Sequence, residues 1–182
     1  PSNVLVVGGE GYSDALSVIP IADAKGEILL LANNEQDLTQ PAINFVKANK
    51  SNVTVIGTDY VIDDATYDAF GATTRINGGS SRFDTNLCIL NKFKDDLCFD
   101  RLYVANASPT VPDNMYADAL VASAAAGKYL DPLVLIDKDE SDATSNAMQY
   151  IRYNALTTSD LELVGGTKVI SKHFEDIMQP IY

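Results

Sequence analysis

The sequence contains few residues that could bind a metal or attack a substrate. Its 182 residues include two cysteines and one histidine. Cys88 and Cys98 lie ten residues apart, a spacing that matches neither a zinc site nor a redox motif. The single histidine, His173, excludes a histidine-rich metal site, and any Ser–His or Cys–His catalytic pair would have to use it. We therefore expect no metal, no cofactor and no catalytic residue.

Basic side chains are also scarce. The chain has 13 Lys and Arg residues against 25 Asp and Glu residues, which gives a net charge of −12. Non-specific binding to nucleic acid or to an anionic membrane surface requires a basic footprint, so both partner classes are excluded. The sequence also lacks the run of about 18 apolar residues that a membrane-spanning helix needs. Its apolar content of 46% is enough for an ordinary globular core.

Four sequence elements occur twice in the same order. Each copy has an apolar run, an Asp-Ala-Leu triplet, a second apolar run and a third apolar run that ends in glycine. The copies occupy residues 4–7, 14–16, 28–31 and 53–57, and then 102–105, 118–120, 133–136 and 161–165. The offset between them grows from 98 residues at the first element to 108 at the glycine. This order, with insertions in the second copy, indicates two repeats of one unit.

The apolar runs are short and uninterrupted, which is typical of parallel strands buried on both faces. Helices are expected between them, at about 13–25, 37–50, 63–70, 83–95, 116–128, 142–155 and 171–179. The predicted fold is α/β, with tandem repeats of a small parallel-sheet βαβ unit that carries helices on both faces. Ser13 and Ser171 are the expected N-caps of the first and last helices, and Pro20 is expected to kink the first.

The two expected repeats span residues 1–74 and 75–182. The second begins with a segment that the first lacks, so the first copy is expected to be truncated on its N-terminal side. Because the chain starts at Pro1 and not at Met, we also expect it to be a piece of a longer protein.

Three polar motifs are candidates for ligand binding. The turn at 8–11 follows a strand but lacks the third glycine of a dinucleotide-binding loop, and Asp14 lies where phosphates would bind, which argues against a nucleotide. Asp14 and Asp118 are repeated at helix starts. They are expected to stabilise the helix N-termini, and the alternative is that they contact ligand hydroxyls. The third motif is a pair of arginines, Arg75 and Arg82, on either side of a Gly/Ser turn.

Two roles are open for these arginines. Each could hold backbone carbonyls or an acidic neighbour, or the pair could present two guanidinium groups to a phosphate or carboxylate. Cys88 is expected to be a core thiol, and a disulfide with Cys98 stays open at this point.

Taken together, the repeated residues resemble a known family. The motifs are Arg75-Ile-x-Gly followed by Arg82-Phe-Asp-Thr-Asn86, Ala117-Asp118-Ala119-Leu120, Asp131-Pro132-Leu-Val-Leu135, and Val164-Gly-Gly-Thr-Lys-Val-Ile-Ser171. They resemble the type 2 cell wall binding repeat, which occurs in surface and S-layer proteins of clostridia and related Gram-positive bacteria. The resemblance covers nearly the whole chain. It implies α/β repeats, usually three in tandem around a pseudo-threefold axis, that attach their parent protein non-covalently to an anionic wall polysaccharide.

The resemblance also implies a binding region. A Pro-Ile-Leu-Leu motif associated with polymer binding maps to Pro132, Leu133, Val134 and Leu135, whereas Ile28 takes the place of the proline in the first copy. We therefore expect a non-catalytic module of a secreted, cell-surface protein. Its expected ligand-binding residues are Arg75, Arg82, Asp118, Pro132, Leu133, Val134 and Leu135.

Two alternatives come from other classes. One is a structural module that assembles with other surface-layer proteins, or with a missing third repeat, through small-residue helix faces such as 122–126. The other is an α/β enzyme acting on a nucleotide or sugar phosphate, which predicts a cofactor-sized pocket at the carboxyl ends of the strands. Because the net charge is −12, an anionic polymer would have to be recognised at local sites and not by the overall field.

Overall fold

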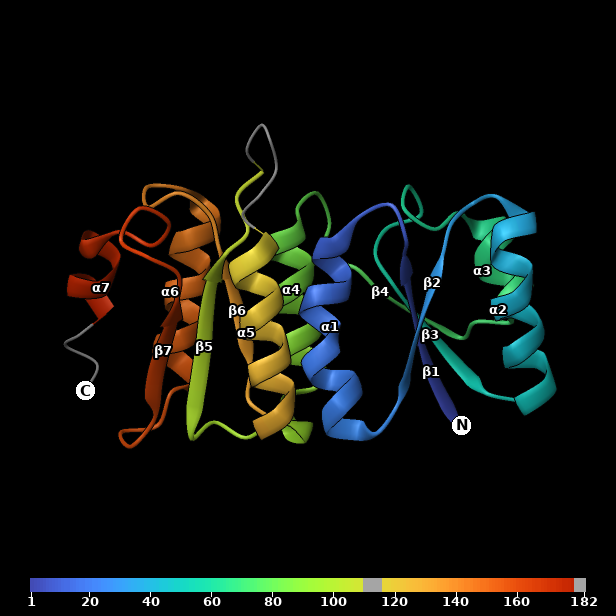
Figure 1. Ribbon diagram of the computed structural model, residues 1–182, viewed down its shortest axis with the longest axis horizontal. Coiled ribbons are helices and arrows are strands. Elements are labelled where there is room, and N and C mark those ends of the chain that lie inside the picture. Colours follow the sequence, from blue (N-terminus) through green and yellow to red (C-terminus); the bar gives the residue numbers. More distant parts are fainter. Residues whose placement is uncertain (110–115, 179–182) are drawn as a thin grey trace.

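The computed structural model describes residues 1–109 and 116–178, and it contains two parallel sheets that lie side by side (Figure 1). The first sheet has the order β2-β1-β3-β4 and the second has the order β6-β5-β7. The strands are β1 (Asn3–Gly8), β2 (Ile28–Ala32), β3 (Asn52–Ile56), β4 (Thr74–Ile76), β5 (Arg101–Asn106), β6 (Leu133–Ile136) and β7 (Asp160–Val164). Every strand pair is parallel.

Helices alternate with these strands. They are α1 (Tyr12–Lys25), α2 (Gln36–Asn49), α3 (Asp64–Phe70), α4 (Arg82–Lys92), α5 (Tyr116–Tyr129), α6 (Asp142–Asn154) and α7 (Lys172–Met178), with a 3-10 turn at Lys94–Asp96. The predicted fold class is confirmed, and each helix begins within one residue of its expected start. α1 continues through Pro20 as one helix.

The predicted N-caps have different outcomes. The Ser171 hydroxyl accepts a hydrogen bond from the Phe174 N–H at 3.0 Å, so this cap is confirmed. The prediction for Ser13 is wrong, because the N-cap of α1 is Gly11, which makes no side-chain bond. Ser13 instead lies within the first turn of α1, where its backbone is already helical.

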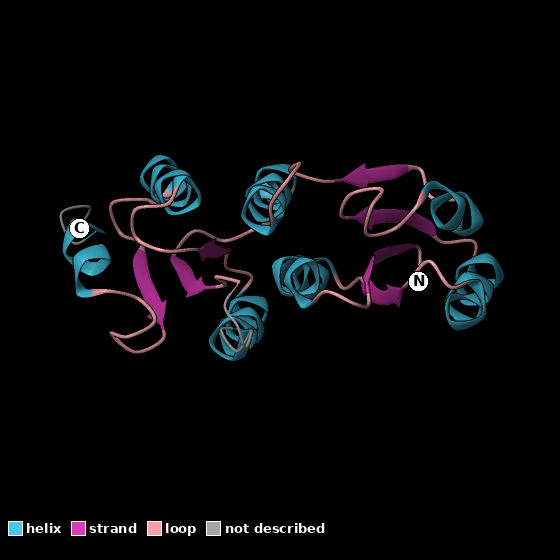
Figure 2. Ribbon diagram, turned by 90° about the horizontal axis from the view of Figure 1, so that it is seen from above, coloured by secondary structure: helices cyan, strands magenta, loops and turns pink. Residues whose placement is uncertain are grey.

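The uninterrupted apolar runs are explained by helices on both faces of each sheet. In β1, Val4 and Val6 pack with α2 and α3, whereas Leu5 and Val7 pack with α1 and α4. In the second sheet, one face packs with α6 and α7 and the other with α5. Figure 2 shows α1 and α4 lying between the two sheets. Alternate residues of β1 therefore enter different cores, which explains why its apolar run is uninterrupted.

Small residues bring the two repeats together along α1 and α5. A Cβ on Gly127 would lie 3.1 Å from the Asp23 Oδ2 atom, and the Ser123 hydroxyl donates to the Leu16 carbonyl at 2.9 Å. Ala122 and Ala126 are fully buried in the same contact. This face was expected to bind another protein under the assembly alternative. The structure corrects that expectation, because α1 of the same chain already covers these residues.

The segment that opens the expected second repeat also joins the first. β4 includes Arg75, yet it pairs with β3 in the first sheet, with Val55 opposite Arg75. From β4 the chain passes into α4, which contacts β6 in the second sheet. The residues 74–92 therefore connect the two sheets physically.

Asn86 on α4 closes the free edge of the second sheet. β6 is an edge strand, so some of its backbone groups lack a strand partner. The Asn86 amide donates to the Leu133 carbonyl at 3.0 Å and accepts from the Leu135 N–H at 3.0 Å. It also donates to the Ser17 hydroxyl of α1 at 3.2 Å, and its side chain is fully buried. One amide thus satisfies an edge strand and contacts a helix of the other repeat.

We expect Asn86→Ala to lower the free energy of unfolding by about 3–5 kcal/mol, because it leaves a buried carbonyl and a buried N–H without partners and opens a cavity. The measurement is urea unfolding followed by circular dichroism. Asn44→Ala is the control, since Asn44 is exposed on α2, and it should change the value by less than about 0.5 kcal/mol. A loss below about 1 kcal/mol for Asn86→Ala would contradict this role.

Candidate functional site

A polar cleft lies at the carboxyl ends of the strands of the first sheet, the place where open α/β sheets bind ligands. It consists of two cavities of about 420 and 310 Å³. Ser13, Asp14, Tyr60 and Val61 line both, so the two cavities adjoin. The larger cavity is also lined by the 8–11 turn and by residues 32–35. The smaller cavity is also lined by residues 79–82 and by Thr85. We call this combined space the first-sheet cleft.

Asp14 lies at the centre of the first-sheet cleft, in the first turn of α1. A Cβ added to Gly57 would be 2.8 Å from the Asp14 Oδ2 atom, and Gly57 has a φ of +105°. The positive φ favours glycine there, and a side chain would also displace the Asp14 carboxylate. Burial raises the pKa of Asp14 above its usual value, and the positive charge of Arg82 partly offsets this effect.

The second repeat contains the same arrangement. The Asp118 Oδ2 atom would lie 3.1 Å from a Cβ on Gly165, whose φ is +140°. The Asp-Ala-Leu triplet and the glycine that ends the third apolar run are therefore one structural motif in each repeat. Their co-occurrence was visible in the sequence, but their contact was not, because more than 40 residues separate Asp14 from Gly57.

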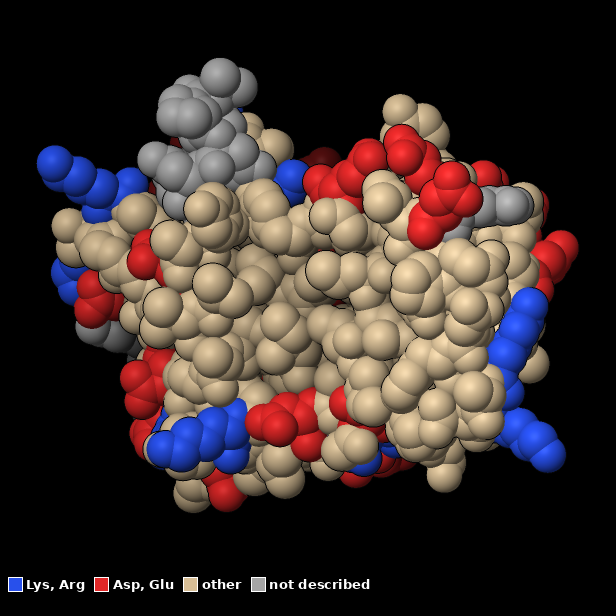
Figure 3. Space-filling model, turned by 45° about the vertical axis from the view of Figure 1, so that its right-hand side comes forward, with Lys and Arg blue, Asp and Glu red and all other residues tan. Residues whose placement is uncertain are grey.

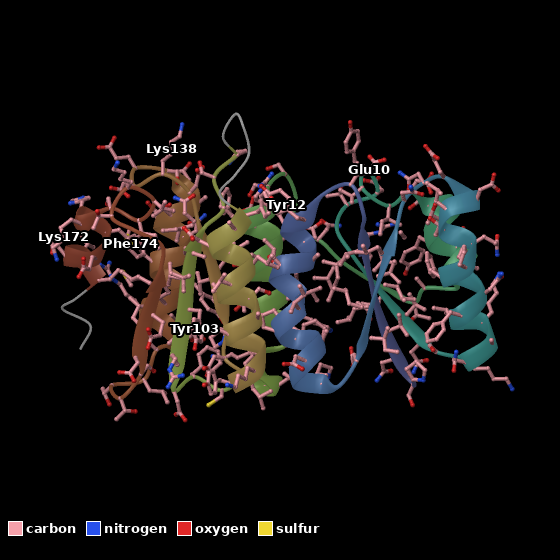
Figure 4. All side chains as sticks on the ribbon, viewed as in Figure 1. Glu10, Tyr12, Tyr103, Lys138, Lys172 and Phe174 are labelled. Carbon is pink, nitrogen blue, oxygen red and sulfur yellow. The ribbon has the colours of Figure 1, made fainter. Side chains whose placement is uncertain are left out.

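Arg82 lines the first-sheet cleft and connects the two repeats. It is the first residue of α4, and its guanidinium donates to the Tyr12 hydroxyl at 3.1 Å and to the Ala107 carbonyl at 3.2 Å. The guanidinium also lies 5.4 Å from the centre of the Tyr12 ring. Figure 4 shows Tyr12 on the same upper side of the molecule as Glu10 and Lys138. Arg82 is thus a cation at the junction between a cleft in one repeat and the backbone of the other.

Arg75 has a different position. Its guanidinium donates to the Gly57 carbonyl at 3.2 Å, lies 3.5 Å from the Asp64 carboxylate and stacks over the Tyr67 ring at 4.8 Å. All these partners belong to the segment that joins β3 to α3 and to α3 itself. Arg75 therefore has the structural role expected as one of its two alternatives: it holds a backbone carbonyl and an acidic neighbour.

The segment from Pro132 to Leu135 is part of the core. Leu133, Val134 and Leu135 have no exposed surface, and Pro132 is buried. The Pro132 carbonyl accepts from the Tyr103 N–H at 3.0 Å. The expectation that these side chains form a wall beside the ligand needs correction, because two layers of helices cover them. They can influence a ligand only by fixing the position of β6.

A smaller cavity of about 270 Å³ lies at the carboxyl ends of the second sheet. Asn106 organises it, donating to the Val169 carbonyl at 3.0 Å and accepting from the Ser108 N–H at 2.7 Å. The Ser108 hydroxyl donates to the Asp137 carboxylate. Lys138 and Lys168 add positive charge to its lining. Sequence reasoning did not identify this cavity, because its residues come from three separate loops.

Among residues 1–109 and 116–178, no cluster of three His, Cys, Asp or Glu side chains is arranged to hold a metal ion. Cys88 and Cys98 are both free thiols. In the same described parts of the chain, no helix has the length and apolar character needed to cross a membrane.

Comparison with protein families decides what kind of module this is. The sequence matches the family described as cell wall binding domain 2 (CWB2) over residues 2–67 and 75–175. The chain belongs to the CWB2 family. It is therefore a cell wall binding module, and the suspected family is confirmed.

Similar proteins agree with this assignment. Two solved Clostridium difficile proteins are similar to the chain over 99% of its length: Cwp6, with a TM-score of 0.80 and 25% identity, and Cwp8, with a TM-score of 0.71 and 20% identity. The match covers 27% of the Cwp6 chain and 29% of the Cwp8 chain.

Two Bacillus subtilis proteins are similar in sequence. The amidase enhancer is 24% identical over 174 residues, and the N-acetylmuramoyl-L-alanine amidase LytC is 22% identical over 173 residues. These alignments cover 94% and 93% of this chain but only 22% and 32% of the relatives. The CWB2 chain thus spans less than a third of the length of each curated relative.

The charge pair in the first-sheet cleft gives a prediction. Arg82→Ala should raise the pKa of Asp14 further, because it removes the charge that opposes the effect of burial. The measurement is a carbon-detected NMR titration of the Asp14 carboxyl. Arg152→Ala is the control, since Arg152 is exposed on α6, and it should leave the titration unchanged. An unchanged Asp14 titration in Arg82→Ala would show that the two groups are not coupled.

Proposed function

We propose that this CWB2 module is non-catalytic and anchors a secreted surface protein to an anionic polysaccharide of a Gram-positive cell wall. The observation that carries the proposal is the family match, which covers both repeats. The non-catalytic assignment is supported by the same match, because the family is described as a binding domain. The amidase names of the relatives belong to proteins at least three times longer than the shared segment.

The charge distribution limits how an anionic polymer can bind. Figure 3 shows acidic side chains gathered along the upper edge of the molecule, on the side of the first repeat. A polymer of the same sign must therefore find local cations, and Arg82 lies in the first-sheet cleft at the junction of the repeats. A planar guanidinium recognises phosphate and carboxylate groups through paired hydrogen bonds.

The other expected site residues have supporting roles in this proposal. Asp118, at the equivalent position to Asp14, accepts a hydrogen bond from a ligand hydroxyl. Arg75 positions the end of β3 through the Gly57 carbonyl. The buried segment 132–135 fixes β6 beneath the second cavity.

We expect Arg82→Ala to weaken binding to wall polysaccharide about tenfold or more, the effect of losing one charge-assisted contact. The measurement is co-sedimentation with purified Gram-positive sacculi, before and after acid extraction of the polysaccharide. Arg152→Ala should bind like the wild type. Arg82→Lys should fall between the two, because it keeps the charge and loses the planar fork. Thermal unfolding of each variant identifies any loss that is due to misfolding.

Two outcomes would contradict the proposal. Equal binding of the wild-type chain to extracted and untreated sacculi would show that the polysaccharide is not the ligand. A steep loss of affinity with added salt would indicate field-driven binding, whereas recognition at local sites within an acidic protein should depend weakly on salt.

A second candidate function is assembly with another repeat or surface protein, and the sheet edges favour it. Asn86 caps the edge of β6, but no described residue caps β2 or β7 in this way. Leu31 of β2 is 61% exposed, and a cavity of about 550 Å³ follows β7 past Leu161 and Leu163. β7 of the second sheet corresponds to β3 of the first sheet. β3 has β4 as its outer neighbour, whereas this cavity lies at the outer side of β7. Exposed edges of this kind pair readily with strands of other chains.

Sedimentation without glycan separates the two functions. Under the assembly function, the chain should self-associate as its concentration rises, and Leu31→Lys should reduce that association because it places a charge on an exposed edge. Leu156→Lys, at another exposed leucine, is the control and should leave association unchanged. A chain that stays monomeric and binds only to sacculi supports anchoring alone.

A further inference from the structure

Tyr60 is the most exposed large side chain of the first-sheet cleft. It is 91% exposed and lines both cavities. A single exposed aromatic residue is common on protein surfaces, so its position matters more than its exposure. Here Tyr60 lines the same cavity as Asp14 and the glycine-rich 8–11 turn. A flat apolar ring next to hydrogen-bonding groups matches the two sides of a pyranose, an apolar C–H face and a rim of hydroxyls.

The loop that carries Tyr60 is held in place from several sides. At its start, Arg75 donates to the Gly57 carbonyl. In its middle, the Asn34 side chain accepts from the Asp63 N–H at 2.9 Å and donates to the Val61 carbonyl at 3.5 Å. These contacts come from β4 and from the β2–α2 loop, so two other segments of the repeat fix the Tyr60 loop. A loop ordered before binding loses less entropy when a ligand arrives.

The charge of the first-sheet cleft selects its occupant. Glu10, Asp14 and Glu35 all line the larger cavity, which lies at the acidic edge seen in Figure 3. A phosphate or carboxylate placed there would be repelled by these groups. A hydroxyl, in contrast, donates a charge-assisted hydrogen bond to a carboxylate. The volume of about 420 Å³ falls within the range of ordinary small-ligand sites.

The second repeat lacks this combination. Lys168 takes the place of Tyr60, at the same offset of 108 residues that separates Gly57 from Gly165. Lys138 takes the place of Asn34, at the offset of 104 residues that separates the two Asp-Ala-Leu motifs. Both lysines line the second cavity. The backbone framework is shared, and among residues 1–109 and 116–178 only the cavity of the first repeat carries this tyrosine platform.

We propose that the larger cavity of the first-sheet cleft binds one uncharged pyranose residue, with the sugar ring stacked on Tyr60 and its hydroxyls bonded to the Asp14 carboxylate. This inference rests on the proposed function, since it assigns one sugar of the wall polymer to one cleft. It differs from the role of Arg82, which contacts an anionic group of the same polymer.

The test uses methyl α-D-glucopyranoside and N-acetylglucosamine as uncharged probes, and glucuronic acid and glucose 6-phosphate as their anionic counterparts. Binding is followed by amide chemical-shift changes in NMR titrations. We expect at least one uncharged sugar to shift the amide signals of Gly9, Gly11, Asp14 and Tyr60, with millimolar affinity. The anionic sugars should bind about tenfold more weakly or not at all, because the carboxylates of the cleft repel them.

Substitutions of two tyrosines make the test specific. Tyr60→Ala should weaken sugar binding about tenfold, and Tyr60→Phe should retain it, because the ring and not the hydroxyl forms the platform. Tyr153→Ala is the matched control, since Tyr153 is 85% exposed on α6 and lies under the Lys94 ammonium, away from the cleft. This variant should bind sugars like the wild type.

Several results would overturn the inference. They are the absence of shifts at the cleft with every uncharged sugar, equal sugar affinity in Tyr60→Ala and the wild type, and tighter binding of the anionic sugars. Co-sedimentation of the wild-type chain with sacculi shows whether the pyranose site alone is wrong or the proposed anchoring function is wrong as well. If the wild type binds sacculi but no sugar binds the cleft, the anchoring function stands and the pyranose site is wrong. If it binds no sacculi, the anchoring function itself is wrong.

Discussion

The Asn86 side chain takes the place of a neighbouring strand along the edge of β6, and α4 holds it there. The same helix inserts Phe83, Ile89 and Leu90 into three different hydrophobic clusters. Arg82, one turn earlier on α4, reaches Ala107 and Tyr12 only when the helix is docked in this position. One side of the first-sheet cleft therefore depends on α4 and its buried amide, which join the repeats together with the α1–α5 contact.

The repeats share structure as well as sequence. β4 opens the second repeat but completes the first sheet, and the small residues of α5 pack closely against α1. Each repeat alone would expose apolar surface that the other now buries. The two repeats of this CWB2 chain therefore pack as one unit, and the first-sheet cleft includes residues from both the first repeat and the β4–α4 connection.

The two repeats keep the same core and differ at the carboxyl ends of their strands. Asp14 with Gly57 and Asp118 with Gly165 are close contacts that allow little change. The exposed loop positions have no such restriction, and there Tyr60 in one repeat corresponds to Lys168 in the other. The internal duplication thus places three carboxylates at the larger cavity of the first repeat, and two lysines with two aspartates at the cavity of the second.

The order and type of the elements were determined by the sequence itself. Uninterrupted apolar runs marked the buried parallel strands, and periodic segments between them marked the helices, because both signals depend on residues close together in the chain. The repeat and the family motifs were visible for the same reason. The motif Arg82-Phe-Asp-Thr-Asn86 was one of the set that indicated the family, although its sequence did not reveal that Asn86 caps a strand.

Only the tertiary structure decided what the individual polar residues contact. It placed Arg75 on the Gly57 carbonyl, buried the segment 132–135, and put Tyr60 and Asp14 in the lining of one cavity. Asp14 and Tyr60 are 46 positions apart in the sequence, and no periodic pattern links them. Local patterns determine which face of an element is buried. Contacts between distant loops depend on how whole elements pack, and those contacts form the site.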